Sequence, residues 1–248
     1  MNEDNKEIAV LDEIGKYFSG KGENSFSKGW ERLYRKFNEE RINLILKYCS
    51  GRRILELGPA HGYVTEKLLS KCDFDITVIE ASVYYDSILK TKFGSKIKII
   101  HDLIENVSFE EKFDTIVNSH FLEHFDNRVE LLKKLRSWLA KDGRVITIVP
   151  NGNSLHRIIG TCLGHLQSPW EINEKEQKIG HKKLYTMQEL NTDISSAGLI
   201  VFKQGGLMLK PLSNLQIESN WSDELIDAFF KIGDTFANYS AELYAIAK

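Results

Sequence analysis

The chain has 248 residues, of which 42% are hydrophobic and 27% are charged, a composition typical of one α/β domain or of one domain with a small cap. Lys and Arg together number 33 and Asp and Glu 35, which gives a formal net charge of −2. This balance provides no general attraction to nucleic acid or to an anionic membrane, so we expect neither as a partner.

The N-terminus and the cysteines favour a cytoplasmic location. Residues 1–7 are polar and partly acidic, unlike the basic start and apolar centre of a secretory signal. The chain contains no apolar run near the roughly 20 residues that span a bilayer. Cys49, Cys72 and Cys162 lack CxxC spacing, which argues against a disulfide framework or a cysteine zinc site. We expect each to be a small packing residue in a reducing compartment.

Residues 1–50 are predicted to form a helical N-terminal extension, and residues 51–248 the main domain. A polar break at 20–29 interrupts the extension. After it, apolar residues recur at roughly helical spacing. These residues are Trp30, Leu33, Tyr34, Phe37, Ile42, Leu44, Ile45 and Tyr48.

From Arg53 onward, short apolar runs alternate with amphipathic stretches. The runs predict strands at 54–57, 75–79, 97–100, 113–117 and 144–149, and the stretches predict helices at 63–70, 82–93 and 127–139. Residues 141–143 are predicted to form a turn before the fifth strand. Such alternation implies right-handed crossovers and an α/β fold with a mainly parallel, doubly wound, Rossmann-like sheet.

Residues 151–185 form an insertion without a strong periodicity. The insertion is rich in glycine and carries three histidines, His156, His165 and His181. A long irregular segment in a compact domain is commonly a lid or a binding loop. Beyond it we predict a helix at 186–197 with Gly198 as its C-cap, a strand at 199–204, a helix at 221–236 and a last strand at 242–247.

Polar residues mark the carboxyl ends of the first three strands. The first strand leads into residues 58–62, where Gly58 and Gly62 let the backbone bend and approach a ligand. Glu56 interrupts the apolar strand before this turn. Glu80 ends the second strand and can accept two hydrogen bonds from a ribose diol, and Asp102 follows the third strand and can meet an adenine amino group. These positions predict a nucleoside-containing cofactor.

Five segments in this order resemble the motifs of class I S-adenosylmethionine (SAM)-dependent methyltransferases: ILELGPAHGYV, VIEAS, HDLIENV, FDTIVNSHFLEHFDN and LRSWLAKDGRVITIVPN. The resemblance covers about residues 50–150 and continues more loosely to the terminal ELYAIA. It implies a seven-stranded sheet with an antiparallel last strand, SAM as cofactor and S-adenosylhomocysteine (SAH) as product. The cofactor-binding residues that it implies are Glu56, Gly58, Pro59, Ala60, Gly62, Glu80, Ala81, Asp102, Leu103, Asn118, Ser119 and His120.

Two other classes of protein compete with this interpretation. A nicotinamide-dependent oxidoreductase would need glycines at positions 60 and 63 to complete GxGxxG, and the chain has Ala60 and Tyr63 there. The same Ala60 departs from the common GxGxG of the methyltransferases, although alanine is small. A non-catalytic SAM-fold subunit would not need a largely intact set of cofactor-binding residues. Nor would it need several histidines at the edge of the sheet where the methyl acceptor binds.

The acceptor side of the predicted sheet carries His120, Glu123 and His124. Methyl transfer is an in-line displacement, so the protein supplies alignment and, for an alcohol acceptor, a base. We predict His124 as this base and His120 as the second candidate. The alternative is that His124 supports the loop and Glu123 binds backbone amides. With His181 these residues also have the composition of a metal site. The resemblance includes some RNA-end methyltransferases that use a related Glu/His cluster, but this chain lacks a basic surface for nucleic acid, so we expect no metal.

The predicted acceptor is a small polar metabolite, such as a sugar, a sugar conjugate or a natural-product intermediate, methylated on oxygen or nitrogen. The chain carries no separate module for binding protein or RNA. Within the insertion and just beyond it, we predict Arg157, His181 and Tyr185 as substrate-binding residues, because a guanidinium or a ring can hold an anionic or polar acceptor.

Overall fold

The computed structural model describes residues 3–19, 28–71 and 73–248. Seven strands lie in the order β3-β2-β1-β4-β5-β7-β6. Their bounds are Arg53–Leu57 for β1, Asp75–Ile79 for β2, Lys98–Ile100 for β3, Phe113–Ser119 for β4, Leu139–Pro150 for β5, Val201–Leu207 for β6 and Glu242–Ala247 for β7. The pairs β1–β2, β1–β4 and β2–β3 are parallel, whereas β7 is antiparallel to both β5 and β6. The predicted Rossmann-like sheet with an antiparallel last strand is therefore confirmed.

Helices connect these strands. The α-helices are α1 Glu3–Ser19, α2 Glu31–Tyr48, α3 Tyr63–Lys71, α4 Val83–Phe93, α5 Arg128–Trp138, α6 Leu155–Cys162, α7 Glu174–Lys178, α8 Met187–Ser196, α9 Asn214–Asn220 and α10 Asp223–Lys231. Short 3₁₀ turns lie at Gly94–Lys96, Ile104–Asn106, Leu122–His124 and Ala237–Tyr239. Among the described residues, no helix combines the length and the apolar character that crossing a membrane requires.

The described chain divides into two compact units. Unit 1 comprises the described parts of residues 1–28, 49–117 and 138–144, and unit 2 comprises residues 29–48, 118–137 and 145–248. The helix α1 therefore belongs to unit 1 and α2 to unit 2. Most of the predicted break at 20–29, and Cys72, lie outside the described residues.

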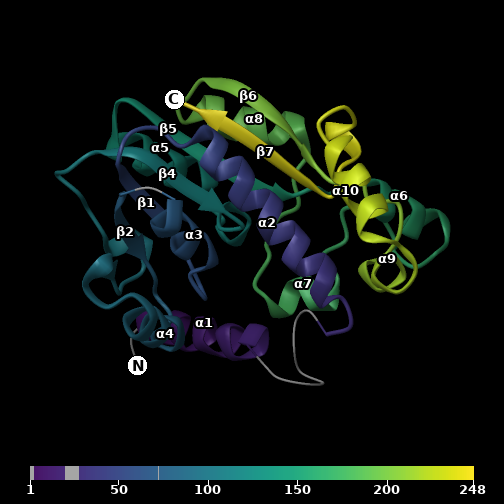
Figure 1. Ribbon diagram of the computed structural model, residues 1–248, viewed down its shortest axis with the longest axis horizontal. Coiled ribbons are helices and arrows are strands. Elements are labelled where there is room, and N and C mark those ends of the chain that lie inside the picture. The colour runs from purple at the N-terminus through teal and green to yellow at the C-terminus, as the bar shows by residue number, and fades with distance from the viewer. Residues whose placement is uncertain (1–2, 20–27, 72) are drawn as a thin grey trace. The chain divides into compact units, whose positions relative to one another are not determined.

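Unit 1 contains strands β1 to β3 and the helices that follow them. The strands β1 and β2 have four buried residues each, because both faces of a parallel sheet are covered. The helix α1 packs beside α4 (Figure 1). At this contact Asp12 accepts hydrogen bonds from the Ser82 hydroxyl, at 2.7 Å, and the Tyr84 amide, at 3.1 Å. Ser82 is also the N-cap of α4, so its side chain both caps α4 and bonds to α1.

Unit 2 contains the antiparallel strands β5, β7 and β6 and the helices α2 and α5 to α10. In β7 every residue from Glu242 to Ala247 is buried. The helix α2 contacts α9 and β6, and its Phe37 ring meets Phe230 of α10 edge to face at 4.9 Å. The Arg32 guanidinium of α2 donates to the Glu218 and Trp221 carbonyls, which ties α2 to the end of α9.

The structure corrects three predicted elements. Residues 141–143 belong to the extended β5 instead of a turn, since Gly143 lets the backbone pass the Phe113 carbonyl where a Cβ would lie at 2.8 Å. The insertion holds two helices, α6 and α7, although its sequence is aperiodic. The predicted helix at 221–236 is shorter, and it follows a separate helix, α9, because Trp221 and Ser222 have extended φ and ψ values.

Candidate active site

In unit 1 the turn after β1 has a left-handed backbone at three positions. The φ values are 56° at Gly58, 50° at Ala60 and 70° at Gly62. A Cβ on Gly62 would lie 2.5 Å from the Phe93 ring, so both conformation and space require glycine there. Ala60 carries its side chain in a conformation that is ordinarily left to glycine, which places strain at the centre of the turn.

Glu80 directly follows β2 and faces this turn. Its side chain is 7% exposed. One carboxylate oxygen accepts a hydrogen bond from the Ser82 amide at 2.9 Å and the other from the Ala60 amide at 3.3 Å. Burial raises the pKa of Glu80 to about 7, and these two amides oppose the rise. Glu80 thus links the turn after β1 to the start of α4.

Glu56 is the second buried carboxylate of unit 1. It lies within β1, is 3% exposed and accepts a hydrogen bond from the Thr65 hydroxyl at 2.6 Å. Burial raises the pKa of Glu56 to about 7, with Thr65 opposing the rise and nearby Glu80 adding to it. Among the described residues, neither carboxylate has a Lys, Arg or His within ion-pair distance.

These two carboxylates fit the cofactor that the resemblance implies. Both are buried without a cation, an arrangement that is unfavourable for the charged forms until a ligand supplies hydrogen-bond donors or positive charge. SAM carries both, because it has a ribose diol, an ammonium group and a sulfonium. Glu80 would hold the ribose hydroxyls and Glu56 the ammonium, while the left-handed turn at 58–62 keeps side chains away from the ligand.

The residues predicted to contact adenine lie at the ends of β2 and β3. The Oδ1 atom of Asp102 accepts from the Leu103 amide at 2.8 Å and the Asn106 amide nitrogen at 2.9 Å. Its Oδ2 atom accepts no hydrogen bond from any described residue, which leaves one acceptor for an adenine amino group. His101 donates to the Ala81 carbonyl at 3.1 Å, and Leu103 is buried.

In unit 2 the end of β4 carries a second strained position. His120 has a φ of 51°, which is uncommon for a residue with a side chain. Its amide donates to the Ile148 carbonyl at 2.8 Å, and this bond holds the conformation. The Asn118 side chain is fully buried, and its Oδ1 atom has no hydrogen-bond partner among the described residues. Strain and an unpaired polar atom at the same strand end are typical of a functional site.

His120 lies between two buried carboxylates. Its Nδ1 atom is 3.1 Å from Glu123 Oε1 and its Nε2 atom is 3.4 Å from Glu242 Oε2. Glu242 also forms a bidentate ion pair with Arg41 of α2. Burial and the Arg41 charge act to lower the pKa of His120, but Glu242 and Glu123 outweigh them and raise it. His120 therefore lies between two carboxylates that favour its protonated form.

Glu123 is fully buried. It belongs to a polar cluster at the end of β4, whose members are Arg41, His120, Glu123, His124, His181 and Glu242. Burial alone would raise the pKa of Glu123, but the hydrogen bond and the charge of His120, with smaller contributions from the protonated forms of His124 and His181, lower it to about 2. Its Oε2 atom has no hydrogen-bond partner among the described residues. Glu123 therefore stays ionised at neutral pH, and one of its oxygens is free.

His124 and His181 complete the cluster. The Nδ1 atom of His124 is 3.1 Å from the Gly180 carbonyl, so Nδ1 is the donor and, in the neutral ring, Nε2 presents a lone pair. The His181 ring meets the His124 ring edge to face at 5.0 Å, and burial lowers the pKa of His181 to about 4. Ligand atoms of Glu123, His124 and His181 lie within 4.8 Å of one another, so these three residues could hold a metal ion. The absence of a metal stays a prediction.

The three predicted substrate-binding residues lie in different environments in the structure. His181 joins the cluster, whereas Arg157 is 5% exposed and donates to the Pro169 carbonyl, the Glu171 carbonyl and the Glu176 carboxylate. These bonds hold the insertion together. Tyr185 is fully buried and donates to Asp193 at 2.9 Å. A substrate contact of Arg157 or Tyr185 stays a prediction that neither environment supports.

Two residues of the cluster were not predicted from the sequence. Glu242 lies more than a hundred positions from His120, and Arg41 lies on α2. The sequence contains a feature that could have indicated each of these two residues. Glu242 begins an otherwise apolar strand, as Glu56 interrupts one. Arg41 follows Phe37 by four positions and shares its helix face, with the guanidinium 5.5 Å from the ring centre.

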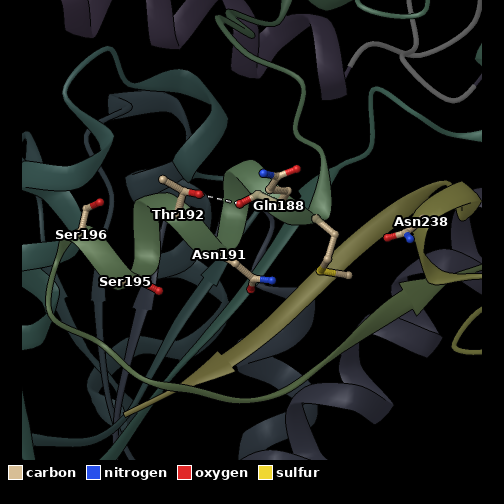
Figure 2. A pocket seen from close by; sticks show the side chains of 7 residues that line it. Gln188, Asn191, Thr192, Ser195, Ser196 and Asn238 are labelled. Carbon is tan, nitrogen blue, oxygen red and sulfur yellow. Dashed lines mark hydrogen bonds between the residues drawn. The ribbon is translucent and has the colours of Figure 1, made fainter.

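A surface hollow also lies on α8, with a volume of about 580 Å³. Figure 2 shows side chains of α8 together with Asn238 from the turn at Ala237–Tyr239, and Thr192 donates to the Gln188 carbonyl. The lining residues are Met187, Gln188, Asn191, Thr192, Ser195, Ser196 and Asn238. They include no titratable group, so this hollow lacks the means for acid–base chemistry.

The strand order, the antiparallel β7 and the acidic ends of β1 and β2 define a class I SAM-dependent methyltransferase. A family model described as a methyltransferase domain matches residues 30–204. The chain belongs to this methyltransferase family, and SAM is its cofactor. This membership decides against the nicotinamide-dependent oxidoreductase and the non-catalytic subunit.

Individual relatives are distant. A malonyl-[acyl-carrier protein] O-methyltransferase from Priestia megaterium (strain DSM 319 / IMG 1521) is 23% identical over 191 residues, 75% of this chain and 67% of that protein. The plantazolicin methyltransferase BpumL, solved with SAH, has a TM-score of 0.59 at 16% identity and covers 98% of this chain and 96% of its own. The N-methyltransferase NodS from Bradyrhizobium japonicum WM9, also solved with SAH, has a TM-score of 0.60 at 17% identity, with coverages of 96% and 97%.

Proposed function

We propose that the protein transfers the methyl group of SAM to an oxygen or nitrogen atom of a small polar metabolite, with His124 as the general base. The observation that carries this proposal is the hydrogen bond between His124 Nδ1 and the Gly180 carbonyl. Because the Gly180 carbonyl holds the proton on Nδ1, the Nε2 atom is an acceptor. An acceptor nitrogen in a cluster of buried histidines and carboxylates is suited to take a proton from a hydroxyl or an ammonium group.

His120 is less suited to this role. Both of its ring nitrogens face carboxylates, Glu123 and Glu242, and its pKa is raised. Carboxylates favour the protonated ring, which cannot accept a further proton, so His120 is better suited to donate to Glu123 and orient it. We therefore place His124 before His120 as the base, which is also the order predicted from the sequence.

The chemistry divides between cofactor and protein. Bound SAM supplies a methyl group already activated on sulfonium, so the chain's residues need only align the acceptor, exclude water and hold its proton. The names of the relatives include an O-methyltransferase and an N-methyltransferase, which supports either acceptor atom. A further structural neighbour is named for methylating plantazolicin, which is consistent with an acceptor other than nucleic acid.

Replacing His124 by Gln is expected to lower turnover by about 10²- to 10⁴-fold, the usual contribution of a general base. SAM affinity is expected to change by less than about threefold, because the binding carboxylates are on unit 1. Turnover is measured as SAH release with a panel of hydroxyl, amine and carboxylate metabolites. The matched control is His165→Gln, since His165 is exposed in the same unit.

Two outcomes would contradict this assignment. Unchanged turnover in His124→Gln would make the residue structural. Loss of turnover after dialysis against EDTA, with recovery on adding a divalent metal, would make His124, Glu123 and His181 metal ligands. No release of SAH with any acceptor of the panel, from protein that binds SAM, would contradict the proposed acceptor class.

A further inference from the structure

Lys210 is a buried cation that the proposed chemistry does not use. It follows β6 and is 7% exposed. Its ammonium donates to the Asn214 side-chain oxygen at 2.7 Å, and no carboxylate of the described residues lies within ion-pair distance. Burial lowers the pKa of Lys210 to about 8. A buried ammonium with only a neutral partner is costly unless a ligand supplies the missing charge.

The carboxylates that act on Lys210 already have other cationic partners. Glu242 attracts Lys210 electrostatically, but it forms a bidentate pair with Arg41 and contacts His120. Glu176 acts on Lys210 in the same direction and is bonded to the Arg157 guanidinium at 2.8 Å. Neither carboxylate is therefore free to neutralise Lys210.

The first turn of α6 belongs to the same buried region. The Ala241 amide donates to the Met208 carbonyl at 2.8 Å and the Asn151 amide donates to the Ala241 carbonyl at 3.1 Å, so the segments that lead to Lys210 and to α6 both bond to the residue before β7. Burial lowers the pKa of His156, and the charge of Lys210 adds to this effect. His156 Nδ1 is buried without a hydrogen-bond partner among the described residues. Ser154 is the N-cap of α6, yet its fully buried hydroxyl makes no capping bond and has no other partner in the described chain.

We propose that Lys210, His156 and Ser154, with the amino end of α6, form a binding subsite for an anionic group of the methyl acceptor, either a carboxylate or a phosphate. The ammonium supplies charge, and the hydroxyl and the ring supply directed hydrogen bonds. The amino end of a helix also favours negative charge. Glu242 contacts His120 and acts on Lys210, so the subsite adjoins the cluster that holds His124.

This inference deepens the proposed function and rests on it only for the identity of the ligand as the acceptor. The probes are inorganic phosphate and acetate, added in separate titrations of the SAM-free protein. The readout is the His156 ring signal in NMR, assigned with His156→Gln. We expect a saturable shift of this signal with at least one of the two anions. Phosphate alone would indicate a phosphorylated acceptor, and acetate alone a carboxylate.

Lys210→Met is the decisive variant. Because methionine fills a similar volume without the buried charge, we expect this variant to fold and to be at least as stable as the parent. Its dissociation constant for the anion should rise at least tenfold. Lys210→Gln provides a second variant should Lys210→Met unfold. The matched control is Lys182→Met, because Lys182 is half exposed and paired with Asp126 in the same unit.

Other results would overturn the subsite. They are a shift that does not saturate with either anion, an affinity unchanged in Lys210→Met and Lys210→Gln, or an equal loss in Lys182→Met. Anion binding is measured without methyl transfer, so the two proposals fail separately. A protein that binds the anion but methylates no acceptor would contradict the proposed function and leave the subsite standing.

Discussion

Replacing Glu80 by Gln is expected to weaken SAM binding by about 100-fold, since two hydrogen bonds to a charged group contribute on the order of 3 kcal/mol. Glu80 is buried, makes hydrogen bonds only to two amides among the described residues and has its pKa raised to about 7. The diol of SAM favours the carboxylate form. SAM affinity of the parent should therefore fall as the pH drops below about 7, and this pH dependence should be lost in Glu80→Gln.

The stability of the SAM-free protein should respond in the opposite direction. The pKa of Glu80 in the folded protein lies above the ordinary glutamate value of 4.5, so its contribution to stability is fully present below that value and is lost as the pH rises through about 7. Glu80→Gln should therefore unfold at a higher urea concentration than the parent at pH 8. Glu110→Gln is the control, because Glu110 is exposed in the same unit. Unchanged SAM affinity in Glu80→Gln would exclude Glu80 as the ribose ligand.

Replacing Glu242 by Met is expected to lower the free energy of unfolding by about 3–5 kcal/mol, because it leaves a buried charge without its partner. Glu242 is 6% exposed and joins Arg41 of α2 to His120. The loss is measured by urea unfolding at neutral pH. The pKa of Glu242 is lowered, chiefly by Arg41 against the effect of burial. Its contribution is therefore present above the ordinary glutamate pKa and is lost as the pH falls through the lowered value.

The double variant Arg41→Met/Glu242→Met distinguishes the coupling energy of the ion pair from the effect of changed packing on stability. Removing both charges leaves neither buried alone, so the double variant should lose less stability than the sum of the two single variants, by about 1–3 kcal/mol. Additive losses would show that the pair contributes no coupling. A Glu242→Met loss below about 1 kcal/mol would contradict a buried, committed carboxylate at this position.

The sequence pattern predicted the parts of the site that lie at strand ends. Glu56 and Glu80 stand out because a polar residue in or just after an apolar strand has no packing role. The turn at 58–62 was predictable from its two glycines. The left-handed backbone of Ala60 and His120 was not, because φ is set by bonds such as that from the His120 amide to Ile148, which form only in the folded sheet.

Residues brought together over long separations were also missed. Arg41 and Glu242 are 201 positions apart, and the charge of Lys210 acts on the distant His156. Periodicity reports only neighbours along one element, so it cannot pair such residues. The helix α7 was missed for another reason. Its sequence lacks an apolar stripe, but Asn173 and Glu176 have capping-box spacing, and the structure contains both of its reciprocal bonds.

The central claim is that the buried carboxylates and left-handed turn of unit 1 bind SAM. Titration calorimetry of the purified protein with SAH tests it most directly, with NADH as the competing ligand. We predict saturable one-to-one binding of SAH, absence of heat with NADH, and strongly reduced SAH binding in Glu80→Gln. Saturable binding of NADH with no binding of SAH would contradict the account.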